Sequence, residues 1–441
     1  MRHLLITIVM LAAALPAFAD AGFTFEPIHQ VGTAGQFELV SLHCWLTNTG
    51  TDRDTFTLHK DEFLPADWQS SFCEGEICYP PFLHDVEVVL DPGISAEILV
   101  DIQVNTVVGS GYDHVTITSG NDPGVTGEWV FAAIHNACDV LVIEDTSDGS
   151  ALRTLLETHM APMIPGIWPR AAEAPTLAAL QAFPKTFWFT GTQGPSFDAG
   201  DQTVIGDFLS AGGKFLISGQ NAASDLCDPG SAWYSVDSCN WYEASTGSEW
   251  TGDHGPSGPL LSGEPGSYLG DNLDLQLDLT QVECDELALG AGVGSVAFRY
   301  PNGNPAGLIR TDNGRLVNLG FDIEGVEDDR GTLATLLERI CTVLDSPTGV
   351  DHPAAFALRV EGNYPNPFNP KTSIRFTAGQ SGMGELSVLD VRGRLLHHET
   401  LLISEGVNQV EFGGEHLSSG VYLYKVQMNG ETAAGRMVLA K

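Results

Sequence analysis

Basic residues are scarce in this chain of 441 residues, which has 20 Lys and Arg against 57 Asp and Glu and a formal net charge of −37. A surface that neutralises phosphates needs clustered Lys and Arg, and the sequence has no such cluster. We therefore expect neither nucleic acid nor an anionic membrane as a partner. An acidic extracellular surface explains the charge, and a calcium-rich or saline environment is the alternative.

The chain also lacks an apolar run of the ~20 residues that a transmembrane helix needs. The run from Leu4 to Leu15 is shorter, follows Arg2 and precedes Ala17-Phe18-Ala19. These features predict a secretory signal peptide over residues 1–19 with an A-x-A cleavage site. A membrane anchor is the weaker alternative, and we expect no transmembrane anchor in the mature chain.

No complete catalytic motif is present in the sequence. It contains neither His-Glu-x-x-His nor a recognisable Ser/His/Asp order, and the Cys and His spacings of zinc sites are missing. The sequence therefore favours a non-enzymatic structural or binding protein. A secreted hydrolase acting on glycans or peptides, and a truncated relative of multidomain secreted peptidases, remain as alternatives.

Eight cysteines in an exported chain indicate disulfides more than metal binding. Cys73 and Cys78 flank a short turn, and Cys227 and Cys239 bracket a loop, so we expect these two pairs to be bonded. The other four have no assignment from sequence: Cys44, Cys138, Cys284 and Cys341.

Residues 20–135 contain short alternating segments separated by turn signals such as Asp91-Pro92-Gly93. Seven strands are expected: Phe23 to Pro27, Phe37 to Leu46, Thr55 to His59, Val86 to Leu90, Ala96 to Val104, His114 to Thr118 and Glu128 to Ile134. This pattern predicts an all-β immunoglobulin-like sandwich. The order of Trp45 to Gly50, then Trp68, then Leu90 to Gly93 resembles bacterial domains that accompany secreted enzymes and adhesins. Such a resemblance implies a spacer or packing partner.

Residues 136–345 change character, because the apolar run Asp139 to Glu144 has the pattern of a strand buried on both faces. Helical and strand patterns then alternate, which predicts a central α/β doubly wound, flavodoxin-like sheet. The stretches Phe187 to Gly191, Gly212 to Gln220 and Leu316 to Glu324 resemble the class I glutamine amidotransferase-like fold. That resemblance implies a catalytic Cys on the elbow at Leu216 to Asn221 and a His near Asp322. Neither is present, so we expect a catalytically degenerate member.

Ligands of open α/β sheets bind beyond the carboxyl ends of the strands. The candidate ligand-binding residues at these ends are Glu144, Asp145, Gln220, Asn221, Asp322 and Glu324. Their oxygens suit a calcium ion or a polyol. The alternative is that these side chains cap helices. Ser218 is a weak candidate nucleophile, since Leu216 and Gln220 replace the glycines of G-x-S-x-G.

Asp225 to Asn272 form an irregular stretch rich in Trp and Tyr, which we expect to be a long loop. Its aromatic rings suit a glycan or surface polymer as partner, and the alternative is that they pack the loop onto the sheet. Residues 346–355 have the composition of a linker.

Residues 356–441 predict a second all-β sandwich. It begins with a motif in which prolines exclude a helix: Asn363, Tyr364, Pro365, Asn366, Pro367, Phe368, Asn369 and Pro370. Together with Asp390 to Arg394, Leu417 to Tyr424 and Met437 to Lys441, this motif resembles the type A C-terminal sorting domain of type IX secretion and the related immunoglobulin-like domain of flagellar hook-capping proteins. The resemblance implies contact with the secretion machinery. It also implies a protein secreted from, or displayed on the surface of, a Gram-negative-type bacterium.

Overall fold

The computed structural model describes residues 21–145, 150–191, 194–255, 259–278, 283–290, 294–311, 314–328, 331–346, 359–378, 382–390, 394–404, 406–428 and 431–441. The expected signal peptide and most of the expected linker lie outside these residues. Two compact units form: one holds 21–138 together with Gly166–Glu173, and the other holds Asp139–Pro165 and Ala174–Lys441. Within the described residues, no helix is long and apolar enough to cross a membrane.

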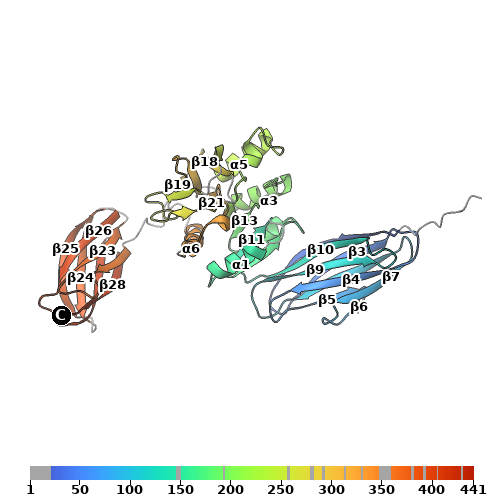
Figure 1. Ribbon diagram of the computed structural model, residues 1–441, viewed down its shortest axis with the longest axis horizontal. Coiled ribbons are helices and arrows are strands. Elements are labelled where there is room, and N and C mark those ends of the chain that lie inside the picture. Colours follow the sequence, from blue (N-terminus) through green and yellow to red (C-terminus); the bar gives the residue numbers. More distant parts are fainter. Residues whose placement is uncertain are drawn as a thin grey trace, which may run out of the picture. The chain divides into compact units, whose positions relative to one another are not determined.

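The N-terminal unit is a sandwich of two five-stranded sheets (Figure 1). One sheet has the order β1 (Phe23–Pro27), β3 (Leu39–Asn48), β8 (Ser95–Gln103), β5 (Gln69–Glu74) and β6 (Ile77–Cys78). The other has the order β2 (Val31–Ala34), β10 (Thr126–His135), β9 (Ser110–Ser119), β4 (Asp54–Phe63) and β7 (Asp85–Leu90). All seven expected strands form, and β2, β5 and β6 are additional.

Strict alternation of side chains builds the core of this sandwich. Leu42, Cys44 and Leu46 point inward from β3 while their neighbours face solvent, and they meet Phe56 and Leu58 of β4 in one buried cluster. Because the side-chain period of a strand is two, a slip of one residue would expose this whole row. The register of the sandwich is therefore fixed by its apolar pattern.

A segment distant in sequence completes the N-terminal unit. The Glu173 carboxylate accepts the backbone N–H of Gln30 at 2.7 Å and that of Val31 at 2.9 Å. The Trp168 indole N–H donates to the Glu173 carbonyl at 2.7 Å, and the Ile167 N–H donates to the Ser110 hydroxyl at 2.9 Å. The N-terminal unit thus includes residues well beyond 135.

The central part contains a nine-stranded sheet with the order β12 (Pro165–Pro169), β11 (Val140–Glu144), β13 (Thr186–Phe189), β14 (Lys214–Ser218), β21 (Arg315–Leu319), β20 (Pro305–Arg310), β19 (Gly294–Arg299), β16 (Leu260–Gly263) and β17 (Leu275–Gln276). The neighbours β11, β13, β14 and β21 are parallel, whereas β21, β20, β19, β16 and β17 pair antiparallel. The sheet is therefore mixed, and a doubly wound, flavodoxin-like sheet is not supported. The physical reason is the turn at Pro301 to Asn304, which folds β19 and β20 into a hairpin.

Seven helical segments accompany the described part of this sheet: α1 (Ser150–His159), α2 (Leu177–Gln181), α3 (Ala199–Ser210), α4 (Ser224–Cys227), α5 (Val236–Thr246), the 3₁₀ helix η1 (Ile323–Gly325) and α6 (Thr332–Asp345). The expectation of one long loop over Asp225 to Asn272 is wrong, because α4, α5, β15 (Ser248–His254) and β16 lie there. β15 pairs with β18 (Cys284–Leu289). A capping box between Ser235 and Ser238 starts α5.

Both expected disulfides are present, Cys73–Cys78 and Cys227–Cys239. Cys73 and Cys78 face each other across β5 and β6. Cys227 ends α4 and Cys239 lies in α5, so the second bond joins these two helices. The remaining four cysteines are buried thiols.

The C-terminal part is a sandwich of a three-stranded and a four-stranded sheet (Figure 1). The first has the order β22 (Arg359–Tyr364), β23 (Lys371–Ala378) and β26 (Gly406–Gly413). The second has the order β25 (Leu395–Ile403), β24 (Gly382–Asp390), β27 (Gly420–Met428) and β28 (Glu431–Leu439). Ile374, Phe376, Leu386 and Val426 contribute to a buried core between the sheets. The chain is thus multidomain and mostly β.

Candidate functional site

The parallel strands β11, β13, β14 and β21 all end at one edge of the central sheet, the carboxyl edge, and all begin at the opposite edge, the amino edge. Ligands of such sheets bind beyond the carboxyl ends of the strands. Ser218 ends β14 and is fully buried. Its hydroxyl donates to the Phe321 carbonyl at 3.3 Å and accepts the N–H of Ile323 at 2.9 Å. These bonds tie β14 to the segment that follows β21, so the Ser218 hydroxyl has a structural role.

Asp322 lies at the carboxyl edge, and its carboxylate serves as a cap. It precedes η1 and accepts the N–H of Glu324 at 3.1 Å. Burial raises the pKa of Asp322 to about 6, and the nearby charge of Asp278 adds to the shift. Glu324 itself is half-buried in η1.

The other candidate residues also lie where the parallel strands end. Glu144 is the last residue of β11 and is buried, and the N–H of Asp145 donates to the Phe189 carbonyl at 3.3 Å. Gln220 is buried after β14. The Asn221 amide, oriented with its nitrogen toward two carbonyls, donates to Glu283 at 2.9 Å and to Gln220 at 3.2 Å.

The candidate residues share an edge without forming a recognisable metal cluster. Across the part of the chain that the structure describes, close groups of three possible ligands occur only at Cys73, Cys78 and Asp101 and at Cys227, Cys239 and Glu243. Both groups contain a disulfide, whose sulfurs are not thiolate ligands. Calcium binding by Glu144, Asp145, Asp322 and Glu324 therefore stays a prediction.

Sequence reasoning missed a buried acid beside this edge. Asp285 lies in β18 with no exposed surface, and its carboxyl oxygens accept the N–H groups of Ala223 at 2.7 Å and Ser224 at 2.9 Å. Burial raises the pKa of Asp285 well above its usual range. The signal in the sequence is the Asp285-Glu286 pair inside an otherwise apolar strand, Cys284 to Leu289.

Glu286, the next residue, holds a histidine that was also missed. The His254 Nδ1 lies 3.0 Å from a Glu286 oxygen, and the His254 ring stacks on Tyr300 with centroids 4.3 Å apart. The side-chain amides of Asn302 and Asn304 donate to the same carboxylate. Burial opposes ionisation, yet the hydrogen bonds from His254, Asn302 and Asn304 lower the pKa of Glu286. Glu286 thus orients His254 as it would a catalytic or metal-binding imidazole.

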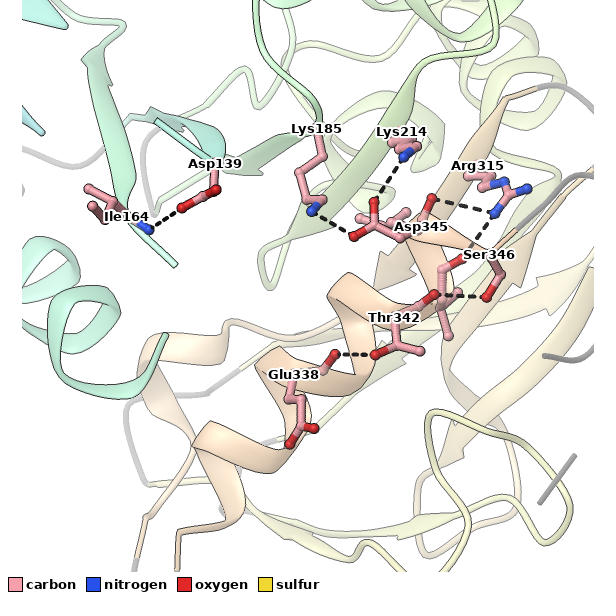
Figure 2. Close-up of polar contacts among 11 residues, drawn as sticks. Asp139, Ile164, Lys185, Lys214, Arg315, Glu338, Thr342, Asp345 and Ser346 are labelled. Carbon is pink, nitrogen blue, oxygen red and sulfur yellow. Dashed lines mark hydrogen bonds and ion pairs between the residues drawn. The ribbon is translucent and has the colours of Figure 1, made fainter. Parts of the chain in front are cut away.

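At the amino edge, basic residues surround the end of α6 (Figure 2). Lys185 and Lys214 each place Nζ 2.8 Å from a different oxygen of Asp345. The Arg315 guanidinium donates to the carbonyls of Val343 and Leu344, both at 3.4 Å. Positive charge at a helix C-terminus complements the helix dipole. A depression of about 400 Å³ lies beside this end, lined by Met163, Glu338, Cys341, Thr342, Asp345 and Ser346.

The motif at 363–370 is anchored to the last strand of the chain. Phe368 is buried in the core, its N–H donates to the Val438 carbonyl at 2.8 Å, and its carbonyl accepts the N–H of Ala440 at 3.0 Å. The Asn366 side chain accepts the N–H of Val438 at 2.9 Å. Tyr364, by contrast, is 84% exposed. The motif therefore closes the sandwich with Phe368 and presents Tyr364 to solvent.

Residues 363–440 match the secretion system C-terminal sorting domain. The tail is a type IX sorting domain. It marks the protein for secretion or for the outer cell surface and implies an interaction with the secretion machinery, which confirms those two expectations.

Outside the sorting domain the comparisons are weak. No curated protein matches the chain. Similar solved structures include the N-terminal domain of PorA, with 11% identity, a TM-score of 0.21, and 25% of this chain and 97% of that chain covered. A family 123 glycoside hydrolase from Clostridium perfringens has 8% identity and a TM-score of 0.19, and the match covers 33% of this chain and 37% of that chain. The secreted serine protease VesC from Vibrio cholerae has 11% identity and a TM-score of 0.19, and the match covers 32% of this chain and 27% of that chain. Likenesses this low carry no argument about function.

Proposed function

We propose that the protein is an exported structural or binding protein without catalytic activity, and that the sorting domain carries the regions 20–135 and 136–345 out of the cell. The main support is that the Ser218 hydroxyl is hydrogen-bonded to the backbone of Phe321 and Ile323, whereas a serine nucleophile needs a hydroxyl in contact with a base. Asp322 and Asp285 are likewise used to hold backbone N–H groups. The polar groups at the carboxyl edge thus have structural partners.

The proposal includes descent of the central unit from an amidotransferase-like domain that has lost its chemistry. One support is that β11, β13, β14 and β21 are parallel neighbours. Another is that Ser218 ends β14, the strand that precedes the elbow on which the catalytic members carry their cysteine. A carboxylate at Asp322 cannot replace the imidazole that generates a thiolate.

A secreted hydrolase of glycans or peptides is the second candidate, and His254 favours it. Its contact with Glu286 fixes one ring nitrogen and leaves the other to act as a base. A panel of peptide and glycan substrates, given to the full-length protein and to His254→Ala and Ser218→Ala, separates the two functions. We expect no turnover by any of the three proteins. Turnover that His254→Ala abolishes, at an unchanged unfolding temperature, would establish the hydrolase instead.

A glycan or surface polymer is the binding partner that we propose for the aromatic region. Trp233 and Tyr234 are exposed, whereas Tyr242 is buried and Trp241 packs 5.7 Å from Phe197. Affinity electrophoresis in gels that contain surface polysaccharides tests this. Trp233→Ala should weaken retention, while Trp45→Ala, an equally exposed tryptophan of the other unit, should not. Equal retention of the wild type, Trp233→Ala and Trp45→Ala would contradict glycan binding by this aromatic region.

Export itself is tested by deleting residues 356–441. We expect the shortened chain to fold, because the sorting domain has its own core, and to remain inside the cell. Fractionation and circular dichroism measure the two properties. An aggregated product would show that the preceding units need the tail to fold.

A further inference from the structure

A lysine with no exposed side-chain surface lies inside the N-terminal sandwich. The Lys60 Nζ contacts a Glu62 oxygen at 2.5 Å, the Ser70 carbonyl at 2.6 Å, the Ser70 hydroxyl at 2.9 Å and the Pro81 carbonyl at 3.2 Å. Lysine is rarely buried to this extent, because its charged form loses hydration. The Lys60 side chain itself has no exposed surface, whereas its partner Glu62 is partly exposed.

A buried acid lies diagonally across the ladder from this lysine. In the β4–β9 register Asp113 is opposite Glu62, and Lys60 is opposite Val115, so Lys60, Glu62 and Asp113 share one face. Asp113 has no exposed surface, and neither of its carboxyl oxygens accepts a hydrogen bond. A buried carboxylate without donors is costly. Burial accordingly raises the pKa of Asp113 to about 6, although Ser70 and Lys60 act in the opposite direction.

We propose that Lys60 and Asp113 are a site of spontaneous intramolecular modification, at which an amide bond joins the Lys60 amine to the Asp113 carboxyl group. Such a bond replaces a buried amine and an unpartnered buried acid by one neutral group. It would link β4 to β9 across the sheet. This inference does not depend on the proposed function.

The reaction needs no oxidant and no outside reactant. The Lys60 nitrogen passes a proton to the Glu62 carboxylate that it contacts and then attacks Cγ of the protonated Asp113 carboxyl group, so that a C–N bond forms and the C–OH bond breaks. The nitrogen gives up two protons in all: one joins the leaving hydroxyl, which is released as water, and the other stays on Glu62. The Lys60 side chain must first turn from Glu62 toward Asp113, and diagonal neighbours of a ladder are within reach of a long side chain.

Intact mass spectrometry of the full-length protein, with its disulfides reduced, tests the bond. We expect a mass lower than that of the linear sequence by one water molecule, and a branched peptide joining β4 and β9 after digestion. Lys60→Met and Asp113→Ala should restore the full mass. Lys185→Met, which removes another buried lysine but leaves this pair intact, should keep the loss.

The wild-type mass decides the question even if a variant does not fold. A wild-type protein with the full mass would overturn the proposal, and so would a loss of water that persists in Asp113→Ala. Glu62→Gln sharpens the chemistry, because without the proton carrier the loss should develop more slowly after refolding. A time course that is unchanged in Glu62→Gln would overturn the role of Glu62 as proton carrier.

Discussion

Acidic side chains have different partners at the two edges of the central sheet: lysines at the amino edge and backbone N–H groups at the carboxyl edge. At the amino edge, Lys185 and Lys214 each contact Asp345 directly, and although burial alone would raise it, their hydrogen bonds lower the pKa of that carboxylate. At the carboxyl edge, Asp322 and Asp285 are buried with backbone N–H partners, and burial raises the pKa of both.

The difference shows how a chain of net charge −37 uses its few cations. Three of them lie around the last turn of α6, where they satisfy a helix end and a carboxylate together. The acids of the other edge accept backbone N–H groups, and because they are buried, protonation is the favourable way to hold them there. Opposite responses to mutation and to pH should follow from this contrast.

The largest effect is expected from Asp285→Ala. The substitution leaves the N–H groups of Ala223 and Ser224 buried without acceptors, which should cost about 3–4 kcal/mol of unfolding free energy. Urea denaturation measures the loss. Glu249→Ala, which removes an exposed acid of the neighbouring strand β15, is the control and should change stability little. Equal effects of the two substitutions would show that the Asp285 cap does not stabilise α4.

The second effect is a pH dependence of opposite sign at the two edges. The folded-state pKa of Asp322 is about 6 against an ordinary 3.8, so its protonated form favours folding below pH 3.8, and that stability is lost as the pH rises through 6. The loss amounts to at most about 3 kcal/mol. Asp345, with its lowered pKa, stabilises above pH 3.8 and loses this contribution as the pH falls.

Unfolding curves of wild type and Asp322→Asn between pH 4 and pH 7 measure the first half of this contrast. The difference between the two proteins should shift in favour of Asp322→Asn as the pH rises. Asp345→Asn, followed further down to about pH 2, should show the reverse trend, with its deficit shrinking as the pH falls below 3.8. Parallel curves for all three proteins would mean that neither edge titrates with folding.

A third, smaller effect separates the two lysines of the amino edge. Lys185 is buried and Lys214 is about one-third exposed, although each contacts Asp345 at 2.8 Å. Lys185→Met should cost about 1–2 kcal/mol and Lys214→Met less than about 1 kcal/mol, since water screens the exposed pair. Thermal unfolding at low and high salt measures both. A larger loss of unfolding free energy for Lys214→Met than for Lys185→Met would show that the exposed ion pair, and not the buried one, contributes more to stability.

The sequence predicted those parts whose local pattern agrees with the fold. Alternation located seven strands of the N-terminal sandwich, and loop spacing located both disulfides. β5 was missed because Gln69-Ser70-Ser71 is polar, and Ser70 faces inward to meet Lys60. α5 was missed because its residues show little amphipathic separation, although Ser235 and Ser238 formed a capping signal.

The site was predictable only in its placement. Parallel strands bring their ends to one edge, so Glu144, Gln220 and Asp322 could be assigned there from the sequence. The direction of each side chain depends on tertiary contacts, such as the cap that Asp322 provides to η1. The pairing of His254 with Glu286 could not be predicted, because the two residues are 32 positions apart and meet only through the pairing of β15 with β18.

The smallest effect is expected from calcium at the carboxyl edge. If Glu144, Asp145, Asp322 and Glu324 shared an ion, added calcium would raise the unfolding temperature by mass action, and Asp322→Asn would abolish the rise. We expect a rise of no more than about 1–2 °C, because the Asp322 carboxyl group is buried and already accepts the Glu324 N–H. Thermal unfolding with calcium, magnesium or chelator measures it. A rise of many degrees that is specific to calcium and absent in Asp322→Asn would show that the acids of this edge are balanced by a bound cation, as Asp345 is by its two lysines.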